Sequence, residues 1–373
     1  MLDINPNLLS YLPKSYAHVD NGNVKLNCSL GVNLEPLPDS VSNILQTFDP
    51  KEMQPYPHDD SIFNSIINRL SNYGNIPSEN ILLGCGSMDL LFNINAMFLS
   101  PGKIVVGYSP QFSSYVDDVY YRGAKYYSFQ LNPKLNFKLD IDEFIEYING
   151  ISKQISIIYI DNPNNPTGQV FTLQDIEKLA IVSKNRNAVL IIDEAYGDFM
   201  LPENSSIPLV LKYENVIVTK TMSKGLGLAG MRLGYMIAPA QINKLMQKIL
   251  FPFNCSSVSK SVCQKRIDTF SQQELLELTK SKNERLYSTL ENGPIKIAYT
   301  SIYSPISLLY VENTKINLHH ELQKIGLGTV SGSSFYNLNY NAVRLMLPAE
   351  ENMDLLIELI AKANNHLEKY YFK

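Results

Sequence analysis

From about residue 60 to residue 240, short apolar runs rich in β-branched residues alternate with amphipathic stretches of helical period. This alternation is typical of an α/β fold in which helices cover a largely parallel sheet. A chain of 373 residues, 45% of them hydrophobic, can bury a large core, and its length favours one large domain with a smaller one beside it. We predict strands at residues 80–83, 103–106, 155–160, 188–192, 215–219 and 233–237.

The two ends of the chain have a different pattern. Residues 1–46 contain prolines and lack a clear period, whereas the C-terminal part combines long helical patterns with two further strands. The helices are predicted at residues 271–290 and 350–370, and the strands at 306–311 and 342–347. We therefore expect a large domain over residues 47–264 and a smaller α+β domain formed by residues 1–46 and 265–373.

Composition and charge exclude several classes of partner. The formal net charge is -4, and no block of basic residues offers a footprint for nucleic acid or an anionic membrane. No apolar stretch reaches ~18 residues, and the N-terminus lacks the features of a signal peptide. Since the 4 cysteines and 5 histidines have no metal-ligand spacing, we expect no metal, buried reduced thiols, a cytoplasmic protein and a small-molecule partner.

Four loops that follow predicted strands carry unusual chemistry, at residues 84–87, 162–168, 193–196 and 221–224. Ligands of such sheets bind beyond the carboxyl ends of the strands, where the connecting loops meet. We therefore expect one crevice to gather all four loops.

The last of these loops contains the most informative residue, Lys224. It follows Thr221 and Ser223, and Arg232 comes shortly after it. An amine can condense with an aldehyde, while hydroxyl groups and a guanidinium fork can hold a phosphate dianion. Pyridoxal phosphate carries both groups, so the sequence predicts a site for this cofactor.

Two other loops supply groups that suit the same cofactor. The turn at residues 84–89 ends a strand and opens a helical run, so its free N–H groups and Ser87 can cradle a phosphate; a plain tight connection is the alternative. Asp193 closes an apolar strand, where a carboxylate is costly unless it is paired. A protonated pyridine nitrogen is a suitable partner, and a helix-capping role is the alternative.

Four more side chains can be interpreted either as site residues or as structural residues. The Tyr196 hydroxyl and the Asn165 amide can reach the 3-oxygen of a pyridine ring, and Phe112 can stack on its face or belong to the core. Two prolines and a glycine fix the turn at 162–168, which favours a site role for that loop. Arg344 interrupts an apolar strand with a donor fork suited to a carboxylate, although a structural salt bridge remains open.

Together these residues resemble the fold-type I pyridoxal phosphate enzymes. The resemblance is to the class I and II aminotransferases, nearest the branch of the histidinol-phosphate aminotransferases and threonine-phosphate decarboxylases. The matching stretches run through nearly the whole chain: Tyr56-Pro57, residues 84–89, 164–168 and 193–196, Ser223-Lys224 with Arg232, and Arg344. The resemblance implies a large domain with a mostly parallel seven-stranded sheet, a smaller α+β domain and a homodimer.

The resemblance also implies a role for each matching residue. Lys224 would hold the cofactor as an internal aldimine and shuttle a proton, and Asp193 would bind the pyridine nitrogen. Tyr196 and Asn165 would bind the 3-oxygen. The remaining cofactor contacts would come from Phe112 on the ring face and, at the phosphate, from Gly86, Ser87, the backbone of Met88, Thr221, Ser223, Arg232 and Tyr56 of the neighbouring subunit. Arg344 would bind the substrate carboxylate, beside Asn165 and Gly31.

Departures from the family pattern concern the substrate. Relatives that bind phosphorylated substrates usually have a second arginine some dozen residues before the counterpart of Arg344, but residues 326–341 contain none. The stretch 31–36 and His58 also differ from the usual pattern, which points to a specialised amino acid.

We expect an aminotransferase that moves an α-amino group between an amino acid and a 2-oxo acid. Decarboxylation or oxidation of an amino acid on the same scaffold is the alternative, because geometry selects which bond at Cα breaks. Two other classes are disfavoured. A catalytically silent effector-binding domain attached to a DNA-binding module would need a basic region, which this chain lacks. A nucleotide-binding α/β protein would need a third glycine in the turn at residues 84–89.

Overall fold

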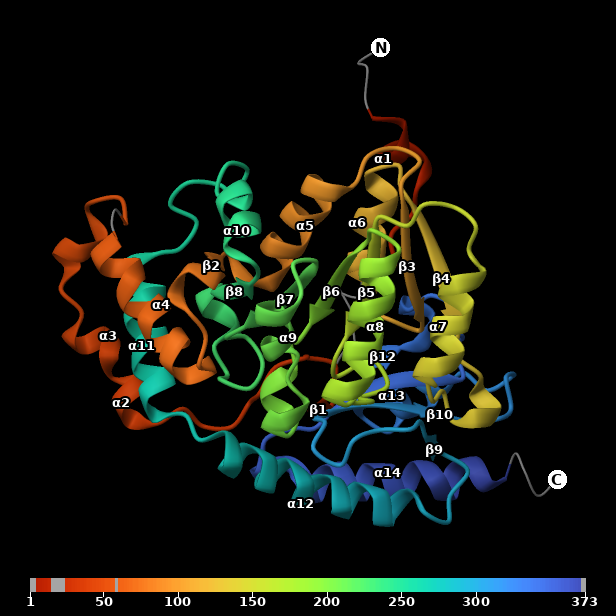
Figure 1. The fold of residues 1–373 in the computed structure, drawn as a ribbon. Coiled ribbons are helices and arrows are strands. Elements are labelled where there is room, and N and C mark those ends of the chain that lie inside the picture. Colours follow the sequence, from red (N-terminus) through yellow and green to blue (C-terminus); the bar gives the residue numbers. More distant parts are fainter. Residues whose placement is uncertain (1–4, 15–23, 58–59, 370–373) are drawn as a thin grey trace.

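A seven-stranded sheet forms the centre of the computed structural model, which describes residues 5–14, 24–57 and 60–369 (Figure 1). The strand order is β2-β8-β7-β6-β5-β3-β4. β8 is antiparallel to both of its neighbours, and the other pairs are parallel. The predicted α/β fold with a mostly parallel sheet is therefore confirmed. The strands are β2 (Ile81–Gly84), β3 (Ile104–Ser109), β4 (Lys125–Gln130), β5 (Ile157–Asp161), β6 (Val189–Asp193), β7 (Val216–Thr221) and β8 (Gly234–Ile237).

The sequence pattern missed β4. This strand pairs only with β3 at the edge of the sheet, and its side chains are exposed or half-buried. A strand buried on both faces has a continuous apolar run, which an edge strand does not need. The six predicted strands are present, with ends that shift by a few residues; β3, for example, continues to Ser109 instead of ending at 106.

Helices cover both faces of the sheet (Figure 1). Because side chains alternate along a strand, Ile191 of β6 packs on one face and Ile192 on the other. The face of Ile191 is covered by α5 (Gly86–Phe98), α6 (Ser113–Tyr121) and α10 (Ala240–Met246). The face of Ile192 is covered by α4 (Asp60–Gly74), α7 (Ile141–Gly150), α8 (Leu173–Asn185), α9 (Ile207–Lys212) and α11 (Ser257–Thr269).

A four-stranded antiparallel sheet in the order β12-β13-β10-β9 follows in the C-terminal part. Two long helices, α12 and α14, lie side by side along it (Figure 1). Leu290 of α12, Ile360 of α14 and Leu309 of β10 belong to its separate apolar core. The elements are β9 (Lys296–Ile297), β10 (Ile306–Tyr310), β12 (Val330–Ser331), β13 (Ala342–Met346), α12 (Gln272–Leu290), α13 (Leu318–Lys324) and α14 (Met353–Glu368).

The N-terminal segment is tied to this C-terminal part. β1 (Leu26–Asn27) pairs in parallel with β11 (Leu327–Gly328), and the Met346 N–H donates to the Cys28 carbonyl at 2.9 Å. These bonds fix the path of residues 28–31 towards the ends of the large sheet. The N-terminal segment also contains three short helices, α1 (Pro6–Ser10), α2 (Asp39–Ser42) and α3 (Ile44–Thr47).

Three of the four cysteines, Cys28, Cys255 and Cys263, are buried thiols as expected. Cys85 is exposed, because it lies in the short turn where β2 gives way to α5. Among the described residues, no helix is both long and apolar enough to cross a membrane.

Candidate active site

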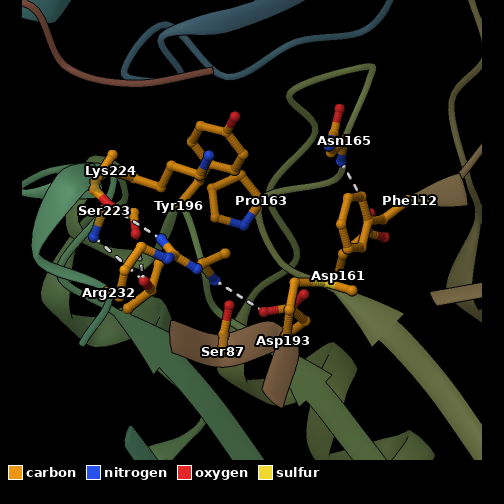
Figure 2. Close-up of a pocket in the computed structure, with 14 residues that line it drawn as sticks. Ser87, Phe112, Asp161, Pro163, Asn165, Asp193, Tyr196, Ser223, Lys224 and Arg232 are labelled. Carbon is orange, nitrogen blue, oxygen red and sulfur yellow. Dashed lines mark hydrogen bonds between the residues drawn. The ribbon is translucent and has the colours of Figure 1, made fainter. Parts of the chain in front are cut away.

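A cavity of ≈ 160 Å³ opens at the carboxyl ends of β5, β6 and β7, beside the first turns of α5 and α6 (Figure 2). All four loops of the expected crevice reach it. Its lining includes these residues predicted from the sequence: Ser87, Met88, Phe112, Asn165, Asp193, Tyr196, Thr221, Ser223, Lys224 and Arg232.

Asp193, the last residue of β6, lies at one end of this cavity. Its Oδ1 accepts hydrogen bonds from Thr219 Oγ1 at 3.0 Å and the Ala195 N–H at 3.1 Å, and its Oδ2 accepts one from Tyr159 Oη at 3.2 Å. Burial, with a smaller contribution from the carboxylate of Asp161, raises the pKa of Asp193 to about 7. All three donors are neutral, so the site favours a cationic ligand at this end.

The opposite end of the cavity suits an anion. Arg232 packs against Gly86 so closely that a Cβ on the glycine would lie 2.7 Å from Arg232 Nη2. Gly86 opens α5, and the side chain of its N-cap residue Cys85 accepts no hydrogen bond, while the Asp89 carboxylate accepts from the Cys85 N–H at 2.9 Å. The N–H groups of Ser87 and Met88 lie at the positive end of this helix. Figure 2 shows Ser223 and Arg232 together at this end, away from Asp193.

Lys224 lines the same cavity and lies next to Ser223 and Tyr196 (Figure 2). Its Nζ is 5.3 Å from the centre of the Tyr196 ring. A Cβ added to Gly31 would lie 2.6 Å from Tyr196 Oη, 3.4 Å from Lys224 Nζ and 3.6 Å from Arg344 Nη2. An amine, a phenol and a guanidinium thus converge on the one place where Gly31 leaves room.

Arg344 connects the parts of the chain that form this side. It lies on β13, is fully buried, and donates from Nη2 to the Ser29 carbonyl at 2.6 Å. Its Nη1 donates to Asn165 Oδ1 at 3.4 Å. A buried guanidinium next to an amine can hold a carboxylate close to that amine.

Comparison with known proteins identifies the family. The family model "Aminotransferase class I and II" matches residues 34–354. The chain belongs to the class I and II aminotransferases.

Two curated relatives of this aminotransferase are histidinol-phosphate aminotransferases. The histidinol-phosphate aminotransferase of Ruminiclostridium cellulolyticum is 29% identical over 81% of this chain and 82% of its own. That of Clostridium novyi is 30% identical over 84% of this chain and 85% of its own. The predicted resemblance to this branch is confirmed, and the comparisons favour amino transfer over decarboxylation or oxidation.

Solved structures share the fold. The histidinol-phosphate aminotransferase of Clostridium acetobutylicum has a TM-score of 0.80 at 22% identity, covering 92% of this chain and 100% of its own. That of Sinorhizobium meliloti, in complex with pyridoxal-5'-phosphate, has a TM-score of 0.81 at 17% identity, covering 98% and 99%. The predicted fold-type I architecture is thus confirmed.

Pyridoxal phosphate is the cofactor of this family, and the cavity of this aminotransferase fits it. The first turn of α5 with Arg232 suits the phosphate, the buried Asp193 suits a ring cation, and Lys224 lines the same cavity. When bound, the cofactor supplies an aldehyde for the amine and an electron sink for a substrate carbanion. The predicted cofactor and aminotransferase activity are confirmed.

Three predicted site residues, Gly31, Gly86 and Arg344, adjoin the lining of the cavity without being part of it. Tyr56 lies apart from the cavity; its side chain is 71% exposed and stacks on Phe253 with 4.9 Å between ring centres. His58, expected near the substrate, lies outside the described residues. Within the described ranges, no group of three or more His, Cys, Asp or Glu side chains could hold a metal ion.

The sequence interpretation of this aminotransferase missed several residues of the cavity. Asp161 is the most informative of them, because it ends β5 in the same way that Asp193 ends β6. The signal in the sequence is the same for both residues, an acidic residue at the end of an apolar run, although a site role was predicted only for Asp193. Ala229 is another missed lining residue, and Tyr159 and Thr219 are missed hydrogen-bond partners of Asp193. Pro163 and Ala195 also line the cavity; they belong to two of the predicted loops, although no role was predicted for either.

Proposed function

We propose that this aminotransferase moves the α-amino group of an amino acid with an uncharged side chain to a 2-oxo acid. Lys224 holds the cofactor and carries the proton at the substrate Cα. The proposal depends on one observation: Lys224 Nζ, Tyr196 Oη and Arg344 Nη2 all lie within a few Å of the space beside Gly31. A carboxylate on Arg344 would place the neighbouring Cα near the amine.

The contacts described above support a role for each of the other residues. Asp193 holds the ring nitrogen in its protonated form. Tyr196 and Asn165 bind the ring 3-oxygen; burial raises the pKa of Tyr196, with the nearby Asp193 also raising it and Arg344 lowering it, so its hydroxyl remains a donor. Phe112 and Ala195 cover the ring. The phosphate is bound by Gly86, Ser87, Met88, Thr221, Ser223 and Arg232.

The uncharged substrate side chain is inferred from the segment next to Arg344. Val330 is the strand partner of Arg344, and the residues that follow it, up to 341, contain neither lysine nor arginine. A phosphate or carboxylate on the side chain would meet no cation that belongs to this segment; the Lys14 amine lies beside it and donates to the Ser333 carbonyl at 3.2 Å. Histidinol phosphate, the substrate named for the relatives, is therefore the compound against which the proposal is tested.

An anaerobic half-reaction with a panel of amino acids and histidinol phosphate tests this function. An uncharged amino acid should convert the bound cofactor to its amine form and yield one equivalent of 2-oxo acid. Release of carbon dioxide would instead support a decarboxylase. Conversion by histidinol phosphate alone would contradict the proposed substrate class.

We also propose a homodimer in which Tyr56 reaches the phosphate of the other subunit. The exposed Tyr56 ring, with exposed Met53, Phe251 and Phe253, supports an interface at this place. Mixed dimers of Lys224→Ala and Tyr56→Ala chains test it, because only a contribution across the interface leaves one of the two sites complete. Recovery of activity on mixing is expected, and its absence in verified mixed dimers would contradict the proposal.

The domain boundaries and location remain proposals as well. One face of the C-terminal sheet has its own apolar core, which supports a large domain at 47–264 and a small one from 1–46 and 265–373. The other face, with Leu308 and Val330, packs on the core of the large sheet. A break in limited proteolysis near 264 would test this boundary, which falls inside α11. Free thiols and a small-molecule substrate support a cytoplasmic location.

A further inference from the structure

Two buried carboxylates lie next to each other at the floor of the cavity. β5 and β6 are parallel, and Asp161 and Asp193 are register partners at their carboxyl ends. Neighbouring strands are about 4.8 Å apart, and register partners point to the same face. The two side chains are 2% and 4% exposed and line the same cavity (Figure 2).

Asp161 has its own set of hydrogen-bond donors. Its Oδ1 accepts from Tyr108 Oη at 2.7 Å, Gln111 Nε2 at 2.9 Å and Asn164 Nδ2 at 3.0 Å. Its Oδ2 accepts from the Asn165 N–H at 3.0 Å. Burial raises the pKa of Asp161, and the four donors oppose this effect because they favour the ionised carboxylate.

The backbone makes room for this arrangement. A Cβ on Gly107 of β3 would overlap Tyr126 Oη and lie 2.6 Å from Gln111 Oε1, so the glycine leaves room for both side chains beside Asp161. The site is therefore shaped to hold a carboxylate at this position. Asp161 is more than an acidic residue left at a strand end.

Like charges in register on neighbouring strands repel each other, and here water does not screen them. Tyr108, Tyr115, Tyr126 and Tyr159 also face the pair, and burial raises the pKa of each phenol. Of the cations that line the cavity, Arg232 lies against Gly86 and Lys224 lies beside Tyr196. The phenols are the neighbours of the two carboxylates. They remain neutral and do not compensate the charge. A pair of this kind destabilises the protein unless a ligand brings a cation.

We propose that Asp161 is a positioning residue for the cofactor: together with Asp193 it makes the ring-nitrogen end of the cavity negative enough to select a protonated ring. This inference rests on the proposed role of Asp193. Asp193 contacts the ring nitrogen, and Asp161 acts through its charge and through the Asn165 loop that it holds.

The affinities of two ligands for the cofactor-free protein distinguish an effect of the Asp161 charge from a purely structural role of this residue. The ligands are pyridoxal phosphate and its analogue with carbon in place of the ring nitrogen, measured by titration at pH 8.5. The ratio of the two dissociation constants reports the interaction with the ring cation. Asp161→Asn should lower this preference about tenfold, the effect of one pKa unit at the ring nitrogen.

Each outcome has a defined meaning. If Asp161 only supports the neighbouring loops, both ligands bind more weakly, the preference is unchanged, and the proposal is overturned. Asp193→Asn should remove most of the preference; if that variant keeps it, the proposed role of Asp193 itself is wrong. The surface change Asp142→Asn is the control for a lost carboxylate and should leave the preference as in the wild type.

A milder variant covers the case in which Asp161→Asn does not fold. Tyr108→Phe removes one donor and leaves the carboxylate, so the pKa of Asp161 should rise. When the pH is lowered, the preference for pyridoxal phosphate should then be lost at a higher pH than in the wild type. An unchanged pH profile in Tyr108→Phe would also count against the proposal, because the Tyr108 bond to Asp161, at 2.7 Å, is the shortest of the hydrogen bonds described for the two carboxylates.

Discussion

Replacing Asp193 by asparagine should make the cofactor-free protein more stable at alkaline pH. The carboxylate is buried, and burial raises its pKa from 3.8 to about 7. The folded protein therefore holds a proton that the unfolded chain releases between these two values. Stability falls as pH rises through this window, and the loss is complete above pH 7.

The size of the effect follows from the shift. A change of ~3 pKa units corresponds to ~4 kcal/mol in the free energy of unfolding above pH 7, and to ~2 kcal/mol at pH 5.5. Asparagine does not titrate, and it can keep the local bonds. Its Oδ1 can accept from Thr219 and Ala195, while its Nδ2 donates to Tyr159 Oη.

Urea unfolding of the cofactor-free wild type and of Asp193→Asn at pH 5.5 and 8.5 measures this difference. The variant should be more stable at both pH values, and its advantage should grow by ~2 kcal/mol between them. The control Asp142→Asn removes an exposed carboxylate and should show no such growth. A variant that is less stable at pH 8.5, or an advantage independent of pH, would refute the reasoning.

Three further changes test other parts of the site. Lys224→Ala should abolish the visible absorption band of the bound cofactor without changing the far-UV circular dichroism; a band that persists in the purified variant contradicts the role of the amine. Arg344→Lys keeps the charge but loses the fork, so amino acid binding should weaken by about 10- to 100-fold with the cofactor retained; loss of the cofactor instead would argue against a carboxylate site. Gly31→Ala should raise KM, because the new methyl group would lie 2.6 Å from Tyr196 Oη; an unchanged KM would show that the substrate does not use this space.

The buried strands were predictable because burial on both faces demands a continuous apolar run. β5, β6 and β7 have this run, and their carboxyl ends define the cavity. The loops that follow them could therefore be assigned to one site from position alone. β4 was not predictable in this way, because an edge strand with half-buried side chains leaves no comparable pattern.

Gly31 shows a different limit. The residues around it have no periodicity, and only the family resemblance indicated its role. Its place beside Lys224 depends on the pairing of Leu26 with Leu327, a contact between distant parts of the chain that local patterns do not encode. Tyr56 poses a similar problem, since a proposed role in another subunit leaves its ring exposed in this one.

The residues that define the site are those that break local rules of folding. Asp161 and Asp193 end apolar strands as buried carboxylates, Arg232 has a left-handed backbone with φ of 53°, and Arg344 is fully buried in a strand. Each of these choices reduces the stability of the empty protein. A ligand with a cation at one end and a phosphate at the other relieves the carboxylates and satisfies the donors in one binding event. The free energy that these residues cost the empty protein is regained when the cofactor binds, and it therefore contributes to cofactor affinity. A substitution at Asp193 that stabilises the cofactor-free protein is accordingly expected to weaken cofactor binding.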